Sequence, residues 1–131
     1  MSKSTSKAER TQVANDFLAE IAGCGRQFFR CGDYVSRFLV DARGRVWFED
    51  SYTLKRIYIH YRYEWRGFTN GGTMRRLIER LRDYIRTGEH PRLPLGPWPQ
   101  YVCGGDLWGY GQDMQKVRDA AARLFGTEAK P

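Results

Sequence analysis

Two histidines and three cysteines are the residues of this chain best suited to act as nucleophiles or bases. Neither His60 nor His90 has a serine, cysteine or acidic neighbour at the spacing of a known catalytic signature. Cys24, Cys31 or Cys103 could still meet His60 in the folded chain, because a Cys-His pair need not be close in sequence. Reduced, unreactive thiols are the simpler interpretation. We therefore predict no enzyme and no catalytic residue, with a small Cys/His enzyme as an alternative.

The cysteine spacing also argues against a metal site. Six residues separate Cys24 from Cys31, which is wider than the usual spacing of paired zinc ligands, and the sequence has no second pair. An odd number of unevenly spaced cysteines fits a reducing compartment better than a disulfide framework. The sequence has neither a P-loop nor a dinucleotide fingerprint, so we expect no metal and no cofactor.

Positive charge is concentrated between Tyr52 and Arg86. This segment holds nine Lys/Arg against three acids, so it carries +6 of the formal net charge of +7. Arginine and lysine neutralise phosphates, and aromatic rings offer faces on which bases stack. Arg, Tyr and Trp are also enriched at the centres of protein interfaces.

The pattern therefore predicts a binding surface for nucleic acid or for an acidic protein surface of a ribonucleoprotein complex. A solvated strand face with packed aromatic rings is the alternative. A homodimer that uses the same arginines is also possible. The predicted binding residues are Arg56, Tyr58, Arg62, Arg66, Arg75, Arg76 and Arg80.

A second candidate for anion binding is the helix start at Gly71, Gly72 and Thr73. Unpaired backbone amides and the helix dipole favour an anion at such a point. The alternative is that the two glycines only permit a tight turn with positive φ.

The elements that must position these residues belong to one domain. A chain of 131 residues can bury a single core, and its 41% hydrophobic content favours folding over disorder. Residues 1–7 form a polar, basic sequence that we expect to be a flexible tail, and residues 8–131 form the domain. Helical periodicity predicts a first helix over Ala8–Ala22, with Thr5 or Ser6 as its N-cap and glycines after it.

Three strands are expected next. Tyr34–Val40 and Arg45–Glu49 are rich in β-branched and aromatic residues and are joined by a turn over 41–44, which predicts a hairpin. The run Tyr52–Tyr63 alternates in polarity, which predicts a third strand. Its core side would present Ile57, Ile59, Tyr61 and Tyr63, and its partly open side Leu54, Arg56, Tyr58, His60 and Arg62.

Two further helices follow. One is predicted over Met74–Arg86 with Thr73 as its N-cap, and the other over Asp113–Phe125. The first would bury a stripe of Met74, Leu77, Ile78, Leu81, Tyr84 and Ile85, and expose Arg75, Arg76, Glu79, Arg80, Arg82, Asp83 and Arg86. The second would bury Met114, Val117, Ala121, Leu124 and Phe125. Between them, residues 87–111 form a long proline- and tryptophan-containing loop.

The predicted fold class is therefore α+β: a three-stranded antiparallel sheet packed by helices, in the order α-β-β-β-α-(long loop)-α. No apolar run approaches the roughly 18 residues of a membrane span, and the N-terminal sequence lacks the apolar segment of a secretory signal. We expect a cytoplasmic protein without a membrane partner.

The order of elements in residues 8–86 resembles the double-stranded-RNA-binding domain. Arg75 and Arg76 stand where that family has paired lysines, whereas Glu79 occupies its third basic position and the turn over 41–44 lacks its histidine. The resemblance implies, as an alternative function, a double-stranded-nucleic-acid-binding module that grips phosphates.

In general character, a small basic domain with a concentrated interaction surface resembles accessory proteins of phages and mobile elements, including the anti-CRISPR proteins. That resemblance implies a non-enzymatic inhibitor of a host defence complex such as CRISPR.

Overall fold

The computed structural model describes residues 6–26, 28–59, 72–88 and 109–125. These residues form the helices α1 (Lys7–Ala22), α2 (Gly72–Thr87) and α3 (Asp113–Phe125). A small antiparallel sheet pairs β1 (Arg30–Cys31) with β2 (Tyr34–Val35), and a larger one has the order β3 (Arg37–Val40), β4 (Val46–Glu49), β5 (Arg56–Tyr58). The predicted α+β class and its three-stranded antiparallel sheet are confirmed.

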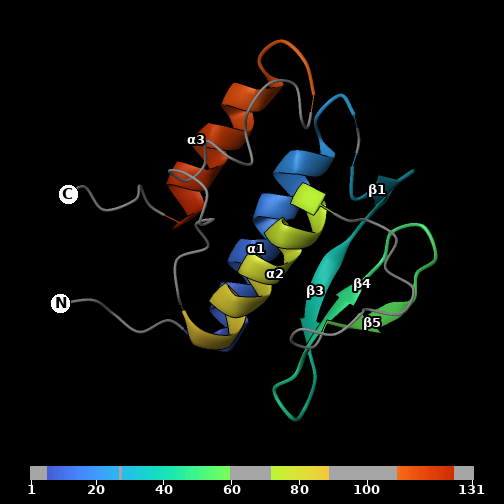
Figure 1. The fold of residues 1–131 in the computed structure, drawn as a ribbon, viewed down its shortest axis with the longest axis vertical. Helices are drawn as coiled ribbons and strands as arrows, with labels where there is room; N and C mark the ends of the chain where they lie inside the picture. The colour runs from blue at the N-terminus through green and yellow to red at the C-terminus, as the bar shows by residue number, and fades with distance from the viewer. Residues whose placement is uncertain (1–5, 27, 60–71, 89–108, 126–131) are drawn as a thin grey trace, which may run out of the picture.

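Helix α1 is at the centre of the molecule. It packs against α2, α3 and β3, so in Figure 1 it lies between α3 and the sheet. Its side chains Phe17, Leu18 and Ile21 are fully buried. The ring of Phe125 packs edge-on against Phe17 at 5.4 Å and against Tyr84 of α2 at 5.1 Å, which ties α3 to both other helices. Helix α3 has the predicted bounds and buries Met114, Val117, Ala120 and Ala121.

The start of α1 is fixed by a capping box. The Ser6 hydroxyl accepts a hydrogen bond from the Glu9 amide at 3.0 Å, and the Glu9 carboxylate accepts one from the Ser6 amide at 2.9 Å. Both bonds satisfy amides that a helix start leaves unpaired. Ser6 is thus the N-cap, and the predicted flexible tail was wrong for Ser6 and Lys7; residues 1–5 lie outside the description. The helix ends at Ala22 as predicted, but Gly23 has a φ of −80° and does not adopt the left-handed conformation.

Helix α2 begins at Gly72, so Thr73 lies inside its first turn and the prediction of Thr73 as N-cap was wrong. Its C-terminus is closed by Gly88, whose φ of +84° lets its amide donate to the Tyr84 carbonyl at 2.8 Å. Arg10 of α1 donates from Nε to the Ile85 carbonyl at 3.0 Å, which satisfies another carbonyl of the last turn.

The register of the larger sheet separates two kinds of side chain. Phe38, Phe48 and Ile57 are paired across the three strands and are buried toward the helices. Leu39, Trp47 and Tyr58 are paired in the next row, on the opposite side of the sheet because side chains alternate along a strand. The predicted alternation is confirmed for residues 56–59; Tyr61 and Tyr63 lie outside the description.

Two strand predictions were wrong in their extent. The run 34–40 is interrupted at Ser36, which does not pair with β4. The Ser36 amide instead donates to the Phe29 carbonyl at 2.8 Å, and the Ser36 hydroxyl accepts from the Ser51 amide at 3.0 Å. The run from Tyr52 begins with a turn, since the Asp50 carboxylate accepts from the amides of Tyr52 and Thr53. Strand β5 therefore starts only at Arg56.

One side chain of α1 joins the helix to β3, which is an edge strand of the larger sheet among the described residues. The Asn15 amide donates from Nδ2 to the Phe38 carbonyl at 3.2 Å, and its Oδ1 accepts from the Phe38 amide at 2.6 Å. These two bonds satisfy the backbone groups of Phe38 that do not pair with β4. Asn15 thus takes the place of a neighbouring strand at this residue.

Arg82 was predicted on an exposed face of the second helix, and this prediction was wrong. Its side chain is only 4% exposed, and its guanidinium donates to the Ile59 carbonyl at 3.2 Å and to the Asp83 carboxylate at 3.0 Å. A buried arginine is tolerated when its donors are paired in this way. Arg82 therefore fixes α2 against the residue that follows β5.

Candidate nucleic-acid interface

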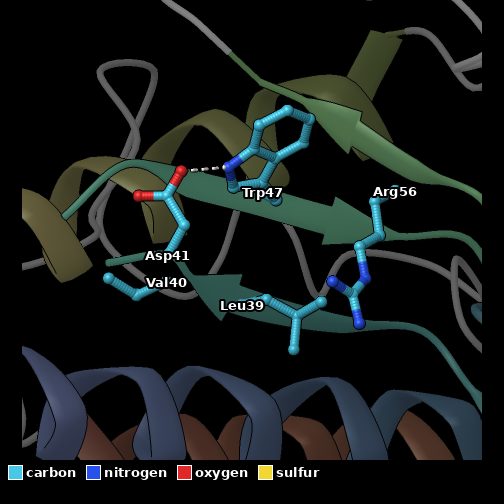
Figure 2. Close-up of a pocket in the computed structure, with 5 residues that line it drawn as sticks. All are labelled: Leu39, Val40, Asp41, Trp47 and Arg56. Carbon is cyan, nitrogen blue, oxygen red and sulfur yellow. Dashed lines mark hydrogen bonds between the residues drawn. The ribbon is translucent and has the colours of Figure 1, made fainter. Parts of the chain in front are cut away.

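One side of the larger sheet faces away from α1 and α2, and it is here called the outer face. Its side chains form an aromatic row across the strands with a polar row on each side of it. We define the outer face by its side chains, in strand order: Arg37, Leu39, Asp41, Arg45, Trp47, Glu49, Arg56 and Tyr58. In Figure 2, α2 passes behind the strands and Trp47 projects on the near side. Hydrogen bonds, ion pairs and ring contacts within and between these rows hold the side chains of the outer face in place.

Trp47 and Tyr58 form the aromatic row with Leu39. Their ring centroids are 4.9 Å apart with the ring planes tilted by 32°. The guanidinium carbon of Arg45 is 5.8 Å from the Trp47 ring centroid and 5.6 Å from that of Tyr58, within the range of a cation-π contact. Tyr58 is 38% exposed. The chain thus presents a stacked aromatic pair and an arginine at one point of its surface.

Asp41 holds two members of this group in place. Its Oδ2 accepts from the Trp47 indole nitrogen at 2.9 Å and from Arg45 Nε at 2.8 Å, and its Oδ1 accepts from the amides of Arg43 and Arg45 at 2.9 Å each. The bond from Trp47, followed by those from Arg45 and Arg43, holds the pKa of Asp41 well below its ordinary range. Asp41 is therefore ionised at neutral pH, and its oxygens are occupied by donors from the same turn and from β4.

Glu49 lies between two arginines in the second polar row. Arg37 donates to it from Nε at 2.8 Å, whereas Arg56 Nε is 4.0 Å from the other carboxylate oxygen. The Arg56 side chain is 64% exposed. A pair at this distance and exposure contributes little to stability. Arg56 is thus the cation of the row that is best placed to meet a ligand.

A hollow of about 330 Å³, here called the outer-face hollow, opens beside Trp47. Figure 2 shows Trp47 on one side, Leu39 and Val40 on the opposite side, and Asp41 and Arg56 at the two ends. Its sides are apolar and its ends are charged.

The predicted binding residues do not form one surface in the described part of the chain. Arg56 and Tyr58 are together on the outer face. Arg80 is half-buried on α2, which packs on the other side of the sheet. The backbones of Arg75 and Arg76 are in the first turns of α2, but their side chains lie outside the description, as do Arg62 and Arg66.

The predicted anion-binding helix start is described only in part. Gly72 is the first residue of α2 and Thr73 the second, while Gly71 lies outside the description.

Cys24 is a poor candidate for a nucleophile. It is buried and its thiol donates toward the carbonyls of Glu20 at 3.4 Å and Asp113 at 3.8 Å. Burial, and secondarily the charge of Asp113, raise the pKa of the thiol, so that it stays protonated and unreactive at neutral pH. Cys31 is half-buried, and Cys103 and His60 lie outside the description. Within the described ranges, no three His, Cys, Asp or Glu side chains are grouped so that they could hold a metal ion.

Sequence reasoning missed six of the eight outer-face residues, among them Asp41, Arg45 and Trp47. The signal was present, because Arg45, Trp47 and Glu49 alternate with the apolar Val46 and Phe48 in the same way as Arg56 and Tyr58 alternate with isoleucines. Pairing Arg45–Glu49 antiparallel with the strand that contains Arg56 and Tyr58 would have placed Trp47 beside Tyr58.

Comparison with known proteins gives a family. A family model described as YoqU matches residues 4–127, and the chain therefore belongs to the YoqU family. No curated protein and no solved structure matches the chain. None of the helices in the described ranges has the length and apolar character needed to cross a membrane.

Proposed function

We propose that this YoqU-family protein is a non-enzymatic binding protein whose outer face engages nucleic acid, either alone or within a ribonucleoprotein complex. The observation that carries the proposal is the stacked pair of Trp47 and Tyr58 with Arg45 over both rings. Stacking on a base contributes about 1–3 kcal/mol per aromatic side chain, and an arginine beside it can bind the adjoining phosphate.

The charges around the aromatic pair support an anionic ligand. Three arginines of the outer face surround two acids, and both acids are engaged by these same arginines. Asp41 accepts four hydrogen bonds, so its charge is compensated locally. The acids therefore oppose an incoming phosphate less than two solvated carboxylates would. The net charge of +7 adds a general attraction for a polyanion.

Binding at this face would also give a mechanism for the expected inhibitory role. A host defence complex such as CRISPR exposes nucleic acid during target recognition, and a small domain bound to that nucleic acid would block it. In this proposal the protein acts by occupancy and catalyses no reaction.

The proposal is tested by fluorescence anisotropy with labelled DNA and RNA, as single strands and as duplexes, at about 50 mM and about 200 mM salt. We expect binding that weakens as salt increases. Tyr58→Ala should weaken it roughly 5- to 150-fold, the equivalent of 1–3 kcal/mol of stacking. Tyr34→Ala is the matched control, because Tyr34 is an exposed strand tyrosine in the other sheet and should leave affinity unchanged. Absence of binding by every probe at the lower salt concentration would overturn the proposal and leave an acidic protein surface as the target.

A further inference from the structure

Resting on the proposed function, we infer that the outer face binds single-stranded nucleic acid by stacking one base in the outer-face hollow, without reading its identity. This assigns a ligand class and a mode of recognition to the hollow beside Trp47. Three features of the hollow support it: its shape, the apolar character of its sides, and the hydrogen bonds that already occupy Trp47 and Asp41.

The shape and sides of the hollow suit a flat aromatic group. Trp47 forms one side and is backed by Tyr58, while Leu39 and Val40 form the other. A base inserted there would meet the Trp47 ring on one face and the Leu39 side chain on the other. The volume of about 330 Å³ lies at the small end of ligand pockets, which range from about 300 to 1,000 Å³. It therefore fits a single nucleotide.

The strand form follows from what must be exposed for stacking. In a duplex each base is stacked on its neighbours and paired, so its flat faces are not accessible to a side chain. Single strands can present unstacked bases to aromatic rings. At the end of the hollow, the exposed Arg56 guanidinium is in position to bind the phosphate of such a nucleotide.

The lack of base discrimination follows from the polar groups that line the hollow. The indole N–H of Trp47 donates to Asp41, and both oxygens of Asp41 accept hydrogen bonds from protein donors. Leu39 has an apolar side chain, and the side chain of Val40 packs against the core. Reading a base requires hydrogen bonds to its edge. Among the described lining residues, Trp47 and Asp41 are engaged with protein partners, and the Arg56 guanidinium is assigned here to the phosphate. Stacking accepts every base, because each has an aromatic face.

The experiment compares three probes against the unmodified protein: a labelled single strand of about 12 nucleotides, the same strand with its internal bases removed, and the corresponding duplex. The base-free strand keeps the phosphates and so isolates the contribution of the bases. We expect the intact strand to bind tightest and the base-free strand roughly 5- to 150-fold more weakly. Single strands of the four homopolymeric sequences should differ from one another by less than about tenfold, the equivalent of one 1.4 kcal/mol step.

A variant tests the location. Leu39→Trp fills the outer-face hollow and should weaken binding of the intact strand to the level of the base-free strand. Val35→Trp is its control, since Val35 is an exposed residue of the smaller sheet. Circular dichroism of both variants establishes that they are folded, and the probe comparison on the unmodified protein is independent of them.

The outcomes separate the inference from the function on which it rests. Equal binding of intact and base-free strands, or tighter binding of the duplex, would overturn single-strand stacking while leaving nucleic-acid binding in place. A single preferred homopolymer by more than a hundredfold would overturn recognition without base reading. Failure of all probes to bind at low salt would instead remove the proposed function itself.

Discussion

The side-chain amide of Asn15 joins α1 to the edge of the larger sheet. The substitution Asn15→Ala measures how much this link contributes to the stability of the fold. The substitution removes both bonds to Phe38, at 2.6 and 3.2 Å, and leaves a backbone amide and a carbonyl without these partners. Each hydrogen bond contributes about 1 kcal/mol net, so their loss costs about 2 kcal/mol. Alanine recovers up to about 0.7 kcal/mol through its higher helix propensity. The expected net loss is therefore about 1–2 kcal/mol in the free energy of unfolding.

Urea denaturation followed by circular dichroism provides the measurement. Gln12→Ala is the matched control: Gln12 lies one turn earlier on α1, is exposed, and bonds only to Asp16 of the same helix among the hydrogen bonds of the described residues. Its replacement should change stability by less than about 0.5 kcal/mol. If Asn15→Ala changes stability no more than Gln12→Ala does, the bonds to β3 do not stabilise the fold and the reasoning is refuted.

Asn15→Asp adds a pH test of the same geometry. An ionised carboxylate still accepts from the Phe38 amide, but its second oxygen faces the Phe38 carbonyl without a proton to share. The protonated form restores a donor, so the folded state would raise the pKa of this carboxyl above the unfolded value of about 3.9. The deficit relative to the unmodified protein should therefore be largest at neutral pH and shrink as pH falls through the raised pKa. A deficit that stays constant down to about pH 3 would contradict this assignment.

Three further predictions concern turns and buried groups. Gly88→Ala should lower stability by about 1 kcal/mol, because Gly88 has a φ of +84°. Gly23 has a φ of −80° and room for a Cβ at ordinary contact distances, so Gly23→Ala should be neutral or slightly stabilising in the same urea experiment. Ser51→Ala should leave stability unchanged or raise it by up to about 1 kcal/mol, since the buried Ser51 hydroxyl has no hydrogen-bond partner in the described part of the chain. A loss of more than about 1 kcal/mol would show that this hydroxyl has a partner. Hydrogen bonds from the Gly25 and Tyr110 amides lower the pKa of Asp113. The ionised carboxylate therefore stabilises the fold at pH values above its unfolded pKa, and this stabilisation is lost as pH falls through the lower folded pKa. Asp113→Asn should flatten the acid limb of a profile of stability against pH, and an unchanged acid limb would count against this prediction.

The helices could be predicted from the sequence because their signals are local. The bounds of α3 and the C-terminal end of α1 follow from apolar periodicity and flanking glycines, and the burial of Ile57 and Ile59 follows from alternation. What the sequence did not reveal depends on tertiary partners. The break at Ser36 is made by one bond to Phe29, beside the β1-β2 pair, and one to Ser51, in the turn that follows β4.

The candidate site was predictable only in part for the same reason. Arg56 and Tyr58 were identified from their side of β5, but their neighbours come from another strand. Trp47 reaches Tyr58 only through the β4-β5 register, and Asp41 reaches Trp47 across the turn that joins β3 to β4. Local charge density added Arg75, Arg76 and Arg80 of α2 to the predicted site, although α2 packs against the other side of the sheet. Counting charges along a chain does not tell on which side of a sheet they lie.

The bridge between Asn15 and Phe38 also has a consequence for association between molecules. An edge strand with unpaired amides and carbonyls is a template onto which a strand of another chain can add, and this is a common route to aggregation. At Phe38 those groups are already bonded to a side chain of α1, and the helix itself packs against β3. Removing the side-chain amide of Asn15 would therefore leave the Phe38 backbone groups able to pair with another chain, and would also weaken the fold. A variant such as Asn15→Ala should self-associate at concentrations where the unmodified chain stays monomeric.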